Sequence, residues 1–226
     1  MLVGEDGLKK LSSCHVAVFG LGGVGSYTAE ELARAGVGEL TIIDNDTVSV
    51  SNINRQLYAL SSTVGMDKTE VARKRIEDIN PDCRVHVRTE FYLPENAESF
   101  FDVKYDYIAD AIDTVSAKLD LAEQAQKRNI PMIACMGTGN KLDPTQFRVS
   151  DINKTSVCPL CRVMRRELKL RNVKKLKVVW SPEMPLKPSE SGENVNKRAV
   201  QGSISFVPPV AGMIMAGEII KDLIKK

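Results

Sequence analysis

The sequence is short of aromatic side chains, of histidine and of any excess of charge of one sign. Aromatic residues make up 5% of its 226 residues, there are two histidines, and 31 Lys and Arg stand against 29 Asp and Glu, a formal net charge of +2. The core must therefore be built mainly from aliphatic side chains. A net charge near zero argues against nucleic-acid binding through bulk positive charge, although the sum hides how the charges are distributed.

Cysteine is present, but it forms neither a disulfide framework nor a complete metal site. The five cysteines are odd in number and irregular in spacing, which argues against disulfides. Cys158 and Cys161 form a C-x-x-C pair, and no cysteine follows them. Two thiolates are half of a tetrahedral zinc site, so zinc is not expected. The histidines, His15 and His86, lie in predicted strands, and we interpret both as structural.

No hydrophobic run reads as a membrane span. Residues 199–217 form a run of 19 uncharged residues, but prolines, glycines and polar side chains interrupt it and Glu218 follows at once. We therefore expect a buried strand, turn and helix there, and no stable membrane insertion. Because residues 1–11 have no apolar signal core, the expected compartment is the cytoplasm.

Short apolar strands alternate with helical stretches over most of the chain. The first predicted strands cover 15–20, 39–44, 84–89, 105–110 and 131–136, with helices at 26–35, 68–79, 94–101 and 116–128. This alternation predicts an α/β fold with a Rossmann-like, doubly wound and mostly parallel sheet and helices on both faces. Later come predicted strands at 146–151 and 176–180 and helices at 159–171 and 209–221, which we interpret as an antiparallel C-terminal extension.

A glycine-rich turn is the strongest local signal. Gly20, Gly22, Gly23 and Gly25 follow a predicted strand and open a helix, and Asp44 ends the next strand. This spacing is typical of a nucleotide-binding turn, in which the helix N-terminus faces phosphate and the acid accepts hydrogen bonds from ribose. The motif alone does not choose between NAD, FAD and ATP.

The charged residues that follow favour a triphosphate. Asp46 and Asn52 precede two cations, Arg55 and Lys68, which a nicotinamide site does not need but a departing pyrophosphate does. Asp113 closes the fourth predicted strand, where it could hold Mg²⁺ between phosphates. Two other interpretations stay open: a solvated loop pair for the cations, and a helix N-cap for the aspartate.

These motifs together resemble the ubiquitin-activating-enzyme superfamily, whose bacterial members include ThiF and MoeB. The residues that carry the resemblance are GLGGVGS, IDND, SNINRQ, VGMDK and AIDT. The resemblance implies an enzyme that uses ATP and Mg²⁺ to adenylate a carboxylate. By motif it puts Asp44 on the ribose, Asn52, Arg55 and Lys68 on the phosphates, and Asp113 on Mg²⁺.

Further segments resemble one subgroup, the tRNA threonylcarbamoyladenosine dehydratase (TcdA/CsdL) family. They are GEDGLKKL, LDPTQF, VMRREL and GSISFVPPVAGMIMAGEIIKDLI. The implied reaction is ATP-dependent cyclisation of threonylcarbamoyladenosine in tRNA through an acyl-adenylate. The alternatives are ThiF/MoeB-like adenylation of the C-terminus of a ubiquitin-like sulfur-carrier protein, a nicotinamide oxidoreductase, and a non-catalytic nucleotide-binding partner.

Two features depart from the wider superfamily. Residues 181–202 hold no cysteine, so thioester transfer from that loop is not expected. Superfamily members also supply an arginine from upstream of the GEDG-like segment, often across a dimer interface, and residues 1–3 contain none. We therefore expect either that the chain starts further upstream or that another basic residue substitutes.

One basic segment stands out from an otherwise acidic chain. Residues 162–177 carry eight basic side chains and one acid, which suits the phosphates of tRNA. The candidate tRNA contacts are Arg162, Arg165, Arg166, Lys169 and Arg171. A solvated helix face and a site for an acidic protein remain alternatives.

The expected organisation is one domain with two parts. Residues 1–139 form an ATP-binding Rossmann-like part, and residues 140–226 form a part for substrate, tRNA and dimer contacts, with a mobile crossover loop at 181–202. The resemblance implies a homodimer. It leaves open a cysteine-desulfurase or sulfur-relay partner and a monovalent cation near the site.

Overall fold

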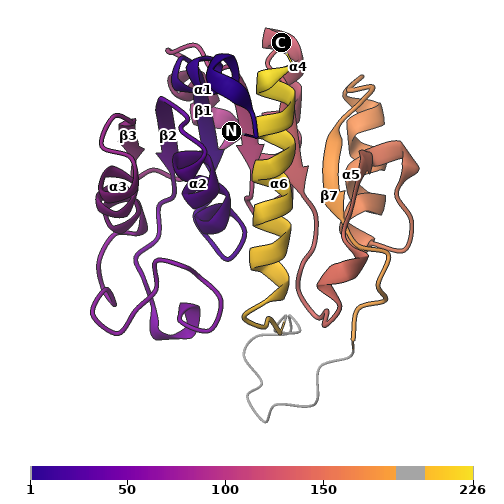
Figure 1. Ribbon diagram of the computed structural model, residues 1–226. Coiled ribbons are helices and arrows are strands. Elements are labelled where there is room, and N and C mark those ends of the chain that lie inside the picture. Colours follow the sequence, from indigo (N-terminus) through magenta and orange to yellow (C-terminus); the bar gives the residue numbers. More distant parts are fainter. Residues whose placement is uncertain (1, 187–201, 226) are drawn as a thin grey trace.

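The computed structural model describes residues 2–186 and 202–225, which form one seven-stranded sheet with helices on both faces (Figure 1). The strands lie in the order β3-β2-β1-β4-β5-β7-β6. They are β1 (His15–Phe19), β2 (Glu39–Ile43), β3 (Arg84–Arg88), β4 (Tyr107–Asp110), β5 (Met132–Cys135), β6 (Arg148–Asp151) and β7 (Lys177–Trp180). All neighbouring pairs are parallel except β6 and β7. The predicted fold, with its antiparallel C-terminal extension, is confirmed.

The helices follow the apolar pattern of the sequence. They are α1 (Gly4–Ser12), α2 (Gly25–Arg34), α3 (Lys68–Ile79), α4 (Val115–Arg128), α5 (Pro159–Leu170) and α6 (Val207–Ile224). Short 3₁₀ helices cover Val50–Asn52, Pro94–Phe100, Pro144–Gln146 and Ile152–Lys154. The predicted α3 has the same bounds in the structure, whereas the predicted helix at 94–101 is a 3₁₀ helix and α6 begins before its prolines.

Two apolar layers hold the helices to the sheet. Val16 and Val18 of β1 pack on one face with side chains of α1, α2, α3 and α6. Ala17 and Phe19 point to the other face and pack with α4, α5 and the Pro94–Phe100 segment. Because β1 is buried along its whole length, a continuous apolar run is what this central strand requires.

The α1 helix was not predicted. It has no side-chain N-cap and buries only Gly7 and Leu11. Contacts with α6, at the other end of the chain, complete its packing. A helix that is stabilised by so distant a partner leaves little local pattern in the sequence.

The C-terminal helix α6 lies against α2 (Figure 1). A Cβ on Gly212 would be 2.3 Å from the carbonyl oxygen of Val24, so the two backbones approach closely. Thr28 Oγ1 donates to the Gly212 carbonyl oxygen at 3.2 Å. No helix among residues 2–186 and 202–225 is long and apolar enough to cross a membrane. Of the structure expected at 199–217, the helix is present as α6, but the strand is not found in the described part: residues 202–206 form no strand, and Ser205 and Phe206 are exposed.

Most of the predicted loop at 181–202 lies outside the described residues. The residues on either side of 187–201 both bond to Asn140. The Leu186 N–H donates to the Asn140 carbonyl at 2.7 Å, and Gly202 exchanges hydrogen bonds of 2.7 and 2.8 Å with its Oδ1 and N–H. The division into parts at residue 139 stays a prediction.

Candidate functional site

The predicted nucleotide residues meet at the carboxyl ends of β1, β2 and β4. They line a cavity of about 630 Å³, which we call the nucleotide cavity. Its lining includes Gly20, Gly22, Gly23, Asp44, Asp46, Asn52, Arg55, Lys68 and Asp113. This volume is in the range of small-ligand sites, which span about 300–1,000 Å³. Strand ends that flank a reversal of strand order are where doubly wound sheets bind ligands.

Two glycines shape the turn that enters the cavity. Gly20 has φ +87°, and a Cβ there would lie 2.8 Å from the Ala111 carbonyl oxygen. A Cβ on Gly25 would lie 1.7 Å from the Gly20 carbonyl oxygen, so no other residue fits. Gly25 is not among the lining residues, and its place in the site is therefore to let α2 start tightly against the turn.

The N-terminus of α2 is open toward the cavity. Val24 is its N-cap, no side chain caps it, and the first turn holds no acidic residue. Val24 also lines the nucleotide cavity. Free backbone N–H groups and the positive end of the helix dipole therefore face the space where an anion can bind.

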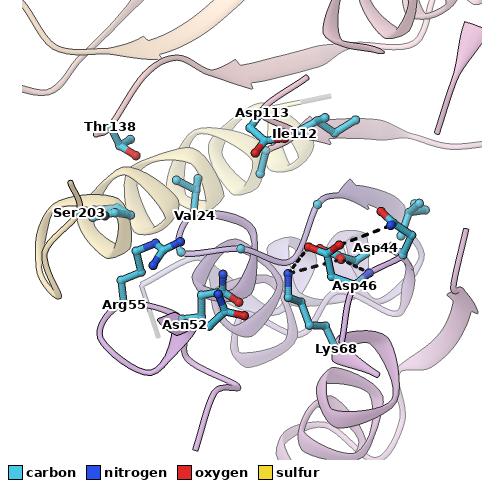
Figure 2. Close-up of a pocket in the computed structure, with 18 of the residues that line it drawn as sticks. Val24, Asp44, Asp46, Asn52, Arg55, Lys68, Ile112, Asp113, Thr138 and Ser203 are labelled. Carbon is cyan, nitrogen blue, oxygen red and sulfur yellow. Dashed lines mark hydrogen bonds and ion pairs between the residues drawn. The ribbon is translucent and has the colours of Figure 1, made fainter. Parts of the chain in front are cut away.

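Asp44 and Asp46 form an acidic pair around Lys68 (Figure 2). The Leu21 N–H donates to Asp44 Oδ2 at 2.6 Å, which ties β2 to the glycine turn. Lys68 Nζ lies 2.7 Å from Asp46 Oδ2 and 3.7 Å from Asp44 Oδ1. The Lys68 side chain is only 5% exposed. Its charge is thus already balanced by the two carboxylates.

Arg55 differs from Lys68 because no carboxylate holds it. Its Nη1 donates to the Ser51 carbonyl at 3.0 Å and to Asn54 Oδ1 at 2.9 Å. Among the residues that the structure describes, Arg55 forms no ion pair. Figure 2 shows Arg55 and Asn52 together on one side of the cavity. Arg55 is therefore the cation whose positive charge is available to a bound anion.

Asp113 lies across the cavity from Asn52, beside Ile112 (Figure 2). It is exposed and stands on the loop after β4, three residues beyond the strand end at Asp110. The alternative of a helix N-cap is wrong, because Thr114 occupies that position of α4. The carboxylate of Asp113 is thus left to face the cavity.

A buried ion pair supports the loop that carries Asp113. Lys118 Nζ lies 2.8 Å from Asp110 Oδ2, and both side chains are 0% exposed. Lys118 also donates to the Ile112 carbonyl at 3.1 Å, and the Ile112 N–H donates to Asp110 Oδ1 at 3.0 Å. Burial raises the pKa of the Asp110 carboxyl, although the Lys118 ammonium opposes that shift. The pair fixes the backbone just before Asp113.

Sequence reasoning missed several residues of this cavity. Phe91 and Thr138 follow β3 and β5 and carry no motif, but their places after parallel strands could have indicated them. Ser203 and Pro208 reach the cavity from the start of α6, and Asn54 Nδ2 donates to the Ser203 carbonyl at 3.0 Å. No local signal in the sequence links these distant segments.

The predicted tRNA residues also gather, in a second place. Arg162, Arg165, Arg166 and Lys169 of α5 line a groove of about 590 Å³ together with Lys174, which we call the basic groove. No Asp or Glu is among the described residues that line it. Arg171 stands at the end of α5 and pairs with Glu167 at 3.3 Å instead. Figure 1 shows α5 and β7 at the end of the sheet away from α3 and β3.

Cys158 and Cys161 sit at the N-terminus of α5, and both are buried. Cys158 is the N-cap, and its sulfur accepts from the Cys161 N–H at 3.5 Å. The hydrogen bond from the Cys161 side chain, with backbone N–H groups, lowers the pKa of Cys158 to about 6 although burial opposes the shift. Neither thiol belongs to a group of three or more candidate metal ligands in the described part of the chain.

The whole chain, residues 1–226, matches the model of the ThiF family. The chain belongs to the ThiF family. This ThiF-family chain is 43% identical over 235 residues to the tRNA threonylcarbamoyladenosine dehydratase of Bacillus subtilis (strain 168), covering 100% of this chain and 92% of that protein. The resemblance to that subgroup, first indicated by motifs, is confirmed.

Solved structures give the same result for this ThiF-family chain. The crystal structure of Escherichia coli tRNA N6-threonylcarbamoyladenosine dehydratase, TcdA, in complex with ATP matches with a TM-score of 0.90 at 36% identity, covering 99% of this chain and 91% of that chain. Its complex with AMP matches with a TM-score of 0.89. The adenylyltransferase and sulfurtransferase MOCS3 of Drosophila sechellia is more distant, at 34% identity over 62% of this chain and 30% of that protein.

Proposed function

We propose that this protein catalyses the ATP-dependent dehydration of threonylcarbamoyladenosine in tRNA through an acyl-adenylate. The observation that carries the proposal is the nucleotide cavity, where a glycine turn, an acidic pair, Arg55 and Asp113 converge. Similarity over the full chain to dehydratases of this name, one of them solved with ATP, supports the choice of substrate. A tRNA substrate in turn supports the cytoplasm as the compartment.

ATP would bind with its phosphates at the N-terminus of α2. The open helix end and the turn at Gly22 and Gly23 offer N–H groups to phosphate oxygens. Asp44, held in place by the Leu21 N–H at 2.6 Å, would accept hydrogen bonds from the ribose hydroxyls. Asn52 lies on the same side as Arg55 and would contribute a polar contact to the phosphates.

Arg55 and Lys68 would contribute unequally to neutralising the phosphate charge of ATP. Arg55 has no carboxylate partner among the described residues, so it would hold the phosphates and stabilise the charge that develops on departing pyrophosphate. Lys68 is bound to Asp46 at 2.7 Å and must share or leave that partner to reach a phosphate. We therefore expect Arg55 to contribute more than Lys68 to the rate.

The residues of the cavity fit Mg²⁺. Four carboxylates and two basic side chains line it, so polyanionic ATP would enter a site that is already acidic. Asp113 offers a carboxylate oxygen, the ligand type that Mg²⁺ prefers. Bound Mg²⁺ would neutralise phosphate charge, and Asp113 would be its ligand from the chain.

The reaction would proceed in two steps. The threonyl carboxylate attacks the α-phosphate of ATP, the bond to the β-phosphate oxygen breaks, and pyrophosphate leaves. The carbamoyl group of the same nucleoside then attacks the acyl carbon, loses a proton and releases AMP as the ring closes. Because both reacting groups are in one molecule, effective molarities of about 10⁵ M or more are attainable, and no protein nucleophile is required.

The basic groove would hold the tRNA backbone. Its five basic side chains and lack of lining carboxylates suit several phosphates at once. No aromatic side chain lines it, so it would position tRNA rather than read bases. The homodimer, the sulfur-relay partner and the monovalent cation stay predictions.

The test is mass spectrometry of nucleosides. The full chain is incubated with ATP, Mg²⁺ and tRNA that bears threonylcarbamoyladenosine, and the tRNA is digested. We expect the modified nucleoside to lose one water only when ATP is present, and Asp113→Asn to slow the loss while Asp102→Asn, an exposed carboxylate outside the cavity, does not. An unchanged nucleoside, with ATP–pyrophosphate exchange that depends on a Gly-Gly carrier protein, would favour carrier adenylation instead.

A further inference from the structure

Both histidines of the chain meet around one glutamate. His15 begins β1, Glu39 begins β2, and His86 lies in β3. The strand register pairs His15 with Glu39 and Thr41 with His86, so these side chains share one face of the sheet. Their ligand atoms all lie within 4.8 Å of one another, and within residues 2–186 and 202–225 this is the single such group of three.

The distances already approach a coordination shell. His86 Nε2 lies 2.7 Å from Glu39 Oε1, and His15 Nδ1 lies 3.7 Å from the same oxygen. Two ligands on a tetrahedral ion with bonds of about 2.1 Å are about 3.4 Å apart. The His86 side chain is 51% exposed, so a small rotation of that ring suffices to open the shorter distance.

A hydrogen bond behind the group orients the buried histidine. His15 Nε2 lies 2.8 Å from Thr41 Oγ1, in the interior. With its hydrogen on Nε2, His15 donates to Thr41 and turns the lone pair of Nδ1 toward Glu39. A histidine that donates one ring N–H to a fixed acceptor while its other nitrogen faces outward is the arrangement found behind bound metal ions.

We propose that His15, Glu39 and His86 bind a divalent transition-metal ion of the zinc class. Two imidazole nitrogens and one carboxylate oxygen suit Zn²⁺, Co²⁺ or Ni²⁺ and suit Mg²⁺ poorly. The exposed side of His86 provides the path of entry and leaves room for water as a fourth ligand. This site is independent of the proposed function, because it lies toward the amino ends of strands whose carboxyl ends form the nucleotide cavity.

Arg84 would compete with a bound metal ion for the carboxylate of Glu39. Arg84 pairs with Glu39 Oε2 and is 74% exposed. The guanidinium and a metal ion would share one carboxylate, so removal of Arg84 should leave Glu39 more negative and bind the ion more tightly. If the three residues formed only a structural ion-pair cluster, loss of Arg84 would weaken the cluster and have no effect on metal.

The test is calorimetric titration of the full chain with ZnCl₂, with a thermal melt of each sample. Because thiolates also bind zinc, the titration is repeated with Cys158→Ser and Cys161→Ser together. We expect about one equivalent of zinc in both proteins, a rise of melting temperature with zinc, and a loss of affinity of tenfold or more in His86→Ala.

Arg84→Gln tests the direction of the change in zinc affinity. We expect it to raise zinc affinity several-fold, whereas Arg73→Gln, which removes an arginine paired with Glu70 and Glu77 on α3, should leave affinity unchanged. Zinc binding that survives His86→Ala, that disappears with the cysteines, or that weakens in Arg84→Gln would overturn the proposal. Failure of this test leaves the dehydratase proposal untouched, since ATP and tRNA are not involved.

Discussion

The nucleotide cavity and the basic groove both contain basic side chains, but the surroundings of these side chains differ. In the cavity, Lys68 is 5% exposed and set between two carboxylates. In the groove, Arg166 is 74% exposed and pairs at 2.8 Å with Glu167, an acid that is not among the lining residues. In the cavity, ion pairs with neighbouring carboxylates fix the position of the Lys68 ammonium group. In the groove, the exposed basic side chains act as a group on a bound polyanion, and salt screens their interaction with it.

The difference explains why a net charge of +2 misleads. Acids elsewhere in the chain balance the bases of the groove in the net charge, although they do not line the groove. A compact ligand such as ATP requires a few charged side chains at fixed positions. A polyanion such as tRNA requires many charged side chains, whose exact positions matter less. Four changes, taken from the largest expected effect to the smallest, test this contrast.

Lys118→Met should have the largest effect. It removes one partner of the buried pair under the cavity wall and leaves the Asp110 carboxylate unpaired, which costs about 3–5 kcal/mol. Urea denaturation measures the loss in the free energy of unfolding. The matched change Lys127→Met, at an exposed position of the same helix, should cost less than about 0.5 kcal/mol. Equal losses in the two variants would mean that the pair does not stabilise the wall.

Arg55→Ala should reduce AMP formation by about 10²-fold, because it removes a group that stabilises phosphate charge in the transition state. Lys68→Ala should cost less, since its carboxylate partners already neutralise it. Single-turnover formation of AMP from ATP and modified tRNA measures both. Arg73→Ala serves as the control. A larger loss in Lys68→Ala than in Arg55→Ala would contradict the assignment of the two cations.

Reversal of Arg162, Arg166 and Lys169 to glutamate should weaken tRNA binding by about tenfold or more and flatten its dependence on salt. Arg165 is left in place because it donates to the Thr155 carbonyl at 3.1 Å and helps to hold the start of α5. Filter binding at several salt concentrations measures the slope. ATP affinity should not change. Unaltered tRNA affinity would show that the groove faces another partner.

At pH 6 and below, Cys158→Ser should have the smallest effect, because the thiolate contributes little there and serine is also an N-cap acceptor. The pKa of Cys158 lies near 6, below its ordinary value of 9.0, so the thiolate stabilises the fold fully above that ordinary value and loses its contribution as pH falls through about 6. The free energy of unfolding of the natural chain should therefore rise between pH 6 and pH 9 relative to the variant. Parallel pH dependences would exclude a thiolate there.

The sequence predicted what is encoded locally. The strand and helix pattern, the glycine turn and the residues just after the strands could all be read from neighbours along the chain. Gly25 is an example, because its fixed spacing from Gly20 determines a contact of backbone with backbone. Such a signal needs no knowledge of the rest of the fold.

Contacts between distant segments could not be read in this way. Nothing in the sequence around Lys118 indicates that it is fully buried against Asp110. The sequence around Gly212 also does not indicate that its backbone approaches that of Val24. Glycine within a helix usually indicates only a lower helix stability. The α1 helix was missed for the same reason. The buried ion pair, the close approach of Gly212 and the α1 helix all depend on which elements the topology places side by side.

Asn140 has a consequence for how this chain can change in length. The residues at 186 and 202 both bond to it, so these two points of the chain lie close together. Ends that meet in this way tolerate inserted sequence, including whole domains. A reporter domain inserted there should leave both the nucleotide cavity and the basic groove intact.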